Sequence, residues 1–89
     1  MIDYTMSSME KQFKINRYAN VVTIDVEREH ATQLADYLVG MNCEVTEVRL
    51  QHATNTGKII IKLNELIDEE LIDCFCNLYF RENGKTDRR

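Results

Sequence analysis

The side chains best suited to chemistry in this sequence are three cysteines and two histidines. Cys74 and Cys76 stand close together, where the apolar period predicts a helix. Two residues on a helix point about 200° apart around its axis, so these thiols diverge and cannot chelate one ion together. An odd cysteine count without framework spacing also indicates a reducing compartment. We therefore expect the cysteines to serve as small hydrophobic core residues.

The two histidines predict no metal centre. His30 falls at a predicted helix start and His52 near a predicted hairpin loop, and neither has an acidic or thiol partner at the spacing of known metal motifs. A nucleophile pair of Cys43 with either histidine stays open as an alternative. The Gly-Lys-Thr at residues 84–86 lacks the strand and helix that frame a phosphate-binding loop. We predict no enzyme activity, no cofactor and no metal.

Composition and charge restrict the class of protein. The chain has 89 residues, 44% of them hydrophobic, as is typical of one small globular domain. A net charge of -4 and a pI near 5.1 argue against nucleic acid as a partner, because such binders carry basic patches. No apolar run of about 18 residues occurs, and the N-terminus lacks the pattern of a secretory signal. We expect no membrane span and a cytoplasmic location.

Hydrophobic periodicity predicts two hairpins of strands. The first has strands at 12–17 and 21–26, with Asn20 supplying left-handed geometry in the turn. The second has strands at 43–51 and 57–63. Alternation in 43–51 is imperfect, which predicts either a β-bulge or a strand covered in part on both faces.

Two amphipathic helices complete the predicted elements. The first starts at Glu29 and leaves through a left-handed Gly40. The second is capped by Asn64 and ends at Gly84. The apolar stripe of the first helix is expected to contain Ala31, Leu34, Ala35 and Leu38; that of the second is expected to contain Ile67, Leu71, Cys74, Phe75, Leu78 and Tyr79.

These elements predict one α+β domain at residues 10–84, between a flexible N-terminal tail at 1–9 and a basic C-terminal tail at 85–89. The order is strand, strand, helix, strand, strand, helix. The fourth strand can insert between the two strands of a right-handed crossover. We therefore expect an antiparallel sheet of about four strands with both helices on one face, and strand 12–17 at its edge.

The other face of this sheet is expected to be open. "TGKIIIKL" at 56–63 places Ile60 between Lys58 and Lys62, on the side opposite to Ile59 and Ile61. The strand at 21–26 contributes Val21, Thr23 and Asp25 to the same face. The alternate residues are expected to point to the helices, namely Val22, Ile24, Val26, Ile59, Ile61 and Leu63. An apolar centre with a charged rim is how many protein interfaces are built. We predict that the open face binds a partner through Val21, Thr23, Lys58, Ile60 and Lys62.

Two family resemblances bear on this prediction. From "VVTIDV" to "LYF" the order resembles the βαββα core of ferredoxin-like domains such as the ACT regulatory module, possible here as a circular permutation. That resemblance implies amino-acid binding at a subunit interface, beside a Gly-rich turn whose counterpart here, "DVEREH", contains no glycine. Residues 21–50 also resemble the core of small phage-encoded inhibitors of bacterial RNA polymerase, which implies occlusion of a host protein surface without chemistry.

The leading hypothesis is a non-enzymatic protein-protein interaction module, a small regulator or inhibitor that occludes a partner's surface and forms a homodimer through its open sheet face. The alternative is an ACT-like module that senses a small molecule. The third reading is weak RNA binding through the sheet face, although RNA-binding sheets display aromatic side chains there. The sequence assigns the aromatics Phe75, Tyr79 and Phe80 to the last helix instead.

Overall fold

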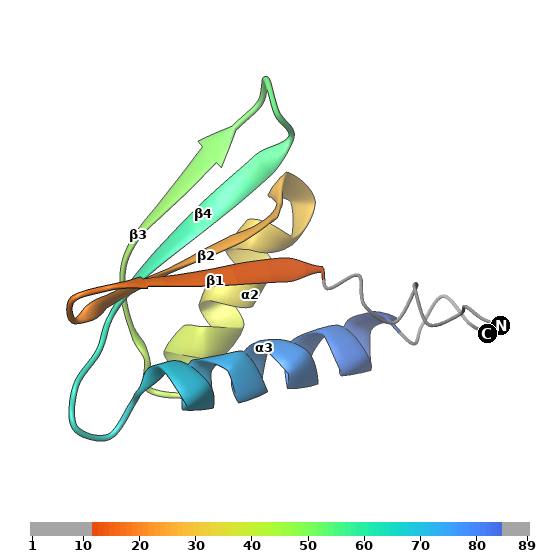
Figure 1. Ribbon diagram of the computed structural model, residues 1–89. Helices are drawn as coiled ribbons and strands as arrows, with labels where there is room; N and C mark the ends of the chain where they lie inside the picture. The colour runs from red at the N-terminus through yellow and green to blue at the C-terminus, as the bar shows by residue number, and fades with distance from the viewer. Residues whose placement is uncertain (1–11, 85–89) are drawn as a thin grey trace, which may run out of the picture.

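The computed structural model describes residues 12–84 and contains four strands and two helices in that range (Figure 1). They follow one another as β1 (Phe13–Tyr18), β2 (Val21–Glu27), α2 (Arg28–Gly40), β3 (Glu44–Gln51), β4 (Thr56–Lys62) and α3 (Glu69–Gly84). The predicted tails at 1–9 and 85–89 lie outside the described residues. No helix of the described part is long and apolar enough to cross a membrane.

The strands form one antiparallel sheet in the order β1-β2-β4-β3. Both helices lie on the same side of it, with α2 beneath β2, β4 and β3 and with α3 beside β1 (Figure 1). The predicted α+β arrangement, a four-stranded antiparallel sheet with two helices, is confirmed. Strand β4 lies between β2 and β3 because the crossover through α2 leaves a gap that the β3–β4 hairpin fills.

The core lies between the sheet and the helices, where alternate strand residues meet the apolar helix stripes. The residues predicted to face the helices from β2 and β4 are all buried, namely Val22, Ile24, Val26, Ile59, Ile61 and the adjacent Leu63. The α2 stripe of Ala31, Leu34, Ala35 and Leu38 is buried as well. The two-residue period of β2 and β4 and the 3.6-residue period of α2 therefore predicted these core residues correctly.

The imperfect alternation of β3 has a structural cause. Val45 pairs with Ile61 and Glu47 with Ile60, so Thr46 is an extra residue without a partner in the register. This irregularity confirms the bulge, one of the two explanations that the sequence left open. It brings Val45 to the same side of the sheet as Val48, although the two differ in parity.

Two predicted left-handed residues are wrong. Gly40 is still helical, and Asn42 has the positive φ of 68° at the exit of α2, where its N–H bonds to the carbonyl of Val39. In the turn between β1 and β2 the left-handed residue is Ala19, with φ of 58°, and not Asn20. Asparagine was the better candidate by residue type, but the hydrogen-bonded register of Tyr18 with Val21 sets which turn residue adopts that conformation.

The last helix begins later than predicted. Asn64 does not cap it; the Asn64 side chain accepts hydrogen bonds from the backbone N–H groups of Leu66 and Ile67, in a loop before the helix. Asp68 performs the capping role, because its Oδ1 accepts the N–H of Leu71 at 2.9 Å. Asparagine and aspartate both suit an N-cap, so residue type alone does not decide between Asn64 and Asp68. Ile67, which lies between them in the sequence, is buried.

The buried stripe of α3 also differs from the predicted one. It consists of Ile72, Cys76, Tyr79 and Phe80, while Cys74 is exposed. Leu71 and Phe75 lie at its margin, half-buried against the core. The helix is apolar around much of its circumference, so its period allows several phases, and contact with β1 and α2 selects one. The stacked rings of Phe13 and Phe80, 5.7 Å apart, mark that contact.

Candidate functional site

The open sheet face is the surface of the sheet turned away from both helices. Residues opposite each other in an antiparallel pair share a face, so the register identifies every member. The face consists of Lys14, Asn16, Tyr18, Val21, Thr23, Asp25, Glu27, Glu44, Glu47, Arg49, Gln51, Thr56, Lys58, Ile60 and Lys62. All five residues predicted to bind a partner belong to it, and whether they bind one stays a prediction.

The apolar part of this face runs across three strands. Tyr18 lies opposite Val21 on β2, and Thr23, two residues further along β2, lies opposite Ile60 on β4. We call these four residues the apolar strip. Val21, Thr23 and Ile60 are half-buried by their neighbours, whereas the Tyr18 side chain is 82% exposed. The strip thus places an exposed aromatic ring at the end of a flat, β-branched surface.

Tyr18 is the site residue that the sequence analysis missed. It was assigned to the turn, but β1 includes it and the two-residue turn at 19–20 sets it opposite Val21. The expectation that no aromatic lies on the open sheet face is therefore wrong. The signal was present in the sequence, since a two-residue hairpin turn after Tyr18 requires this pairing.

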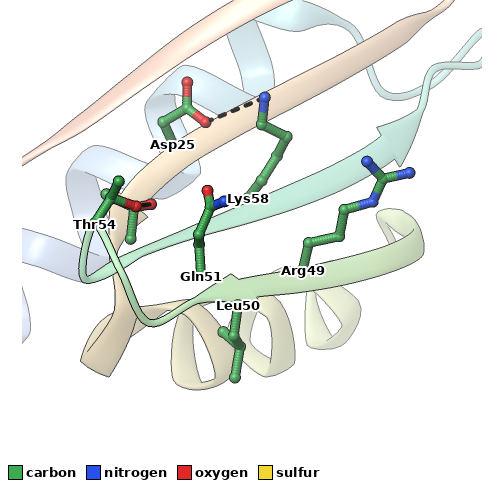
Figure 2. A pocket seen from close by; sticks show the side chains of 7 residues that line it. Asp25, Arg49, Leu50, Gln51, Thr54 and Lys58 are labelled. Carbon is green, nitrogen blue, oxygen red and sulfur yellow. Dashed lines mark hydrogen bonds and ion pairs between the residues drawn. The ribbon is translucent and has the colours of Figure 1, made fainter.

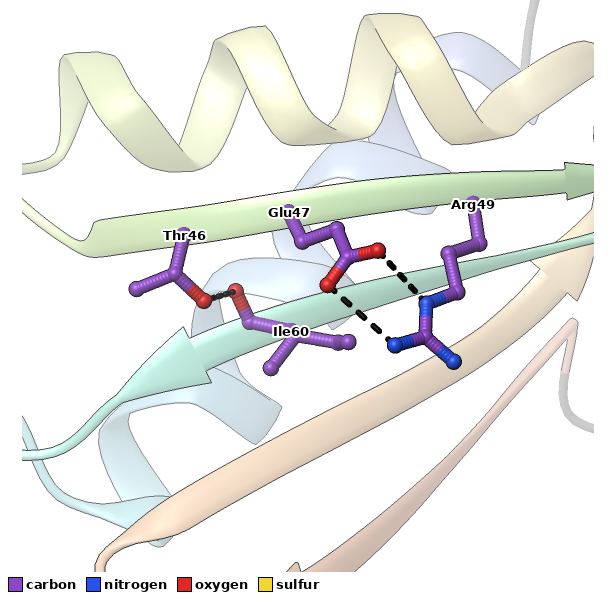
Figure 3. Close-up of polar contacts among 4 residues, drawn as sticks. All are labelled: Thr46, Glu47, Arg49 and Ile60. Atoms are coloured by element: carbon purple, nitrogen blue, oxygen red, sulfur yellow. Dashed lines mark hydrogen bonds and ion pairs between the residues drawn. The ribbon is translucent and has the colours of Figure 1, made fainter.

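Ile60 has polar groups of β3 as its neighbours. The hydroxyl of Thr46, the bulge residue, donates a hydrogen bond to the Ile60 carbonyl at 3.2 Å. The Ile60 side chain lies on the same face as its cross-strand partner Glu47, which is joined to Arg49 (Figure 3). Thr46, the extra residue at the bulge of β3, is therefore hydrogen-bonded to the backbone of β4. The Ile60 side chain lies at the centre of the open sheet face.

Glu47 and Arg49 form a two-point ion pair at the β3 side of the face. The Arg49 Nε and Nη2 atoms donate to the two Glu47 carboxylate oxygens at 2.6 and 3.3 Å. This hydrogen bonding lowers the pKa of Glu47 and raises the pKa of Arg49. Both side chains are solvent-exposed, so the pair contributes little to stability, and its importance is the charge pattern that it displays.

The remaining charges of the open sheet face also offset one another. Lys58 lies 3.7 Å from Asp25, which accepts a long hydrogen bond of 3.5 Å from Asn16. Lys62 is the cross-strand neighbour of Glu44. A surface that neutralises phosphates needs positive charge in excess, which these paired charges do not supply.

A pocket of about 770 Å³ opens where the face meets the β3–β4 hairpin (Figure 2). Polar residues supply most of its lining, which consists of Asp25, Arg49, Leu50, Gln51, Thr54, Thr56 and Lys58 and to which their aliphatic portions also contribute. The Lys58 and Asp25 side chains meet in it, whereas Leu50 points away from the other side chains (Figure 2).

His30 has acidic neighbours that the sequence analysis did not foresee. Glu27, Glu29 and His30 bring three potential ligand atoms within 4.8 Å of one another at the start of α2. This grouping in space does not follow any of the metal-motif spacings that the sequence analysis considered, and the expectation of no metal stays a prediction. The two exposed carboxylates also suit the positive end of the helix dipole, which accounts for their position without an ion.

The alternative of a cysteine nucleophile gains no support from Cys43. Its side chain is buried, and this burial raises the pKa of the thiol. A raised pKa reduces the thiolate fraction that nucleophilic attack requires.

Compared with protein-family models and with curated proteins, the sequence matches none.

Proposed function

We propose that the protein is a protein-protein interaction module that binds its partner through the open sheet face. The observation that carries this proposal is the apolar strip, which extends across three strands and has an exposed tyrosine at one end. Tyrosine is enriched at interface centres, where its ring supplies contact area at low entropic cost. Offset charges surround the strip, as in the polar rim of a protein interface.

A small regulator that acts by occlusion needs only such a face. The strip and its rim lie on one sheet surface, so a partner can cover them without a conformational change. We also infer a circularly permuted ferredoxin-like topology. The unit β2-α2-β3-β4-α3 supplies the βαββα core, and β1 occupies the sheet edge beside β2.

The proposal is tested by placing a charge at the centre of the strip. Ile60→Glu is compared with Leu66→Glu, which introduces the same charge at an apolar side chain that is 84% exposed and lies in the loop before α3. Tagged wild type and both variants are used to capture proteins from the native lysate. Binding of the purified candidate is then measured by calorimetry, after circular dichroism has shown that each variant is folded.

We expect Ile60→Glu to weaken partner binding by about 2 kcal/mol or more, close to thirtyfold, because a buried interface centre would contain an unpaired charge. Leu66→Glu is expected to bind as the wild type does. Equal affinity of the two variants would refute the proposal. So would capture of RNA with a steep loss of affinity on adding salt, since that outcome supports a phosphate-binding face.

A second candidate function is the sensing of a small polar molecule, which the pocket beside the β3–β4 hairpin favours. Its volume lies within the range of ligand-binding pockets. A thermal-shift screen of amino acids and other small polar metabolites tests this function. A ligand that raises the melting temperature of the wild type but not of Lys58→Ala would support sensing.

A further inference from the structure

The outer side of β3 is a free sheet edge within the described residues. β3 is the last strand in the order β1-β2-β4-β3, so its other side faces no described strand. A free edge presents backbone N–H and C=O groups that can pair with another chain. We propose that two copies of this chain pair antiparallel through β3, about a two-fold axis at Val48, and join their sheets into one.

Apolar side chains accompany this edge on the helix side of the sheet. Val48 and Leu50 pair with Ile59 and Gly57, which face the helices, yet they are 36% and 47% exposed because α2 does not cover them fully. The helix adds Val39, which is 55% exposed. Tyr37 of α2 contacts Tyr79 of α3. Val39 is two residues further along α2, about 200° around the helix axis, so it lies on the opposite side of α2, toward β3.

The charges of β3 select one register for the pair. Opposite residues must share a face, so the two-fold axis has to pass through a residue and not between two. An axis at Val48 sets Glu47 of each copy opposite Arg49 of the other. An axis at Glu47 or at Arg49 would set identical charges opposite one another, which destabilises a strand pair. The pattern Glu-Val-Arg is thus complementary to itself in one alignment.

The other free edge does not have this property. β1 displays Lys14 and Arg17 and contains no acidic residue, so no register of two copies sets opposite charges against one another. The bulge at Thr46 restricts regular pairing about an axis at Val48 to Glu47–Arg49, which contains both charges and the exposed Val48, and it sets Leu50 of each copy opposite Thr46 of the other. A second copy is therefore the occupant that the β3 edge fits.

This dimer uses the sheet edge and leaves the open sheet face accessible. It differs in this respect from a homodimer formed face to face. The apolar strips of the two copies would lie on the same side of one joined sheet, and a partner could then be bound twice. The dimer and the proposed function can consequently fail independently of each other.

The test uses charge reversal and mixing. Arg49→Glu leaves two acidic residues at positions 47 and 49, and Glu47→Arg leaves two basic ones. Each variant alone sets like charges opposite one another in the dimer, so we expect its dimerisation to weaken about tenfold or more. An equimolar mixture restores opposite charges and is expected to form a heterodimer. Analytical ultracentrifugation and native mass spectrometry measure both results, with Leu66→Glu as a variant that should still dimerise, because its charge lies in the loop before α3, away from β3.

Several results would overturn the inference. They are a wild type that stays monomeric up to about 1 mM, charge variants that dimerise like the wild type, and a mixture that does not associate. A measurement on the wild type avoids any doubt about the folding of a variant. Hydrogen exchange of the outward amides in Glu47–Arg49 should slow as protein concentration rises, and exchange that is independent of concentration would also contradict the dimer.

Discussion

Ala19 holds the turn between β1 and β2 in a left-handed conformation, with φ of 58°. An L side chain in this region costs about 1–2 kcal/mol, whereas glycine adopts it without strain. We expect Ala19→Gly to raise the free energy of unfolding by about 0.5–1 kcal/mol, because the relief of strain exceeds the extra freedom of glycine in the unfolded chain. Urea unfolding followed by circular dichroism measures this change.

The neighbouring turn residue provides a matched control. Asn20 is not among the left-handed residues of the described chain. Asn20→Gly therefore relieves no strain and only increases the freedom of the unfolded chain, which should lower stability. If both substitutions changed stability in the same direction, strain at Ala19 would not be the cause.

Cys74 and Cys76 show how the phase of a helix decides the role of a residue. Cys76 is buried on the face that meets the core, and Cys74 is exposed. The divergence of the two thiols followed from helix geometry alone. The expectation that both cysteines are buried is wrong for Cys74, because side chains that point to opposite sides of one helix rarely reach the same core.

At the level of elements, the contact between α2 and β4 depends on a missing side chain. A Cβ atom added to Gly57 would overlap the Cβ of Ala31 in the first turns of α2. Gly57→Ala should therefore destabilise the protein by about 1–3 kcal/mol through overpacking. Chemical unfolding of the variant checks the magnitude.

The complementary substitution at Ala31 identifies the cause of that loss. Ala31→Gly alone should cost about 1 kcal/mol, since glycine is unfavourable within a helix. In the double variant Gly57→Ala with Ala31→Gly, the overlap is absent, so the total loss should be smaller than the sum of the two single losses. Additive losses would show that the close approach of α2 to β4 does not limit the packing.

At the scale of the whole molecule, an aromatic cluster joins both helices to the edge of the sheet. Tyr79 of α3 is buried, its hydroxyl donates to Gln33 of α2 at 3.2 Å, and its ring contacts His30 and Tyr37. Phe80 beside it stacks on Phe13 of β1. The cluster thus packs three elements that are distant in sequence against one another.

Burial of two tyrosines of this cluster and of Cys43 predicts how the stability of the fold depends on pH. Desolvation raises the pKa of Tyr79 and Tyr37 above the ordinary value of 10.0, and it raises the pKa of Cys43 above 9.0. The unfolded chain therefore loses these protons first as pH rises. The stabilisation is fully present below about pH 9 and decreases as pH rises through the unfolded-state values toward the raised folded-state ones.

Urea unfolding at several pH values between neutral and strongly alkaline measures this decrease. Tyr79→Phe removes one of the three titrating groups, so its stability should start lower, owing to the lost hydrogen bond, and fall less steeply with pH. Identical slopes for wild type and variant would exclude Tyr79 as a contributor.

The sequence by itself determined the elements and the inward faces of the two central strands and α2. Alternation in β2 and β4 identified Val22, Ile24 and Ile61 as core residues, and it placed Ile60 on the other side. These predictions hold because the 2-residue and 3.6-residue periods follow from backbone geometry within each element. The break in alternation likewise located the bulge of β3.

Only the tertiary structure decided the contacts between elements. Packing against β1 and α2 chose the buried face of α3, and the strand order made β3 a free edge. The structure also showed that Glu47 and Arg49 form a pair beside Ile60. The apolar period within one element does not determine which face of α3 is buried or which strands lie at the edges of the sheet. Packing between segments that are distant in the sequence determines both.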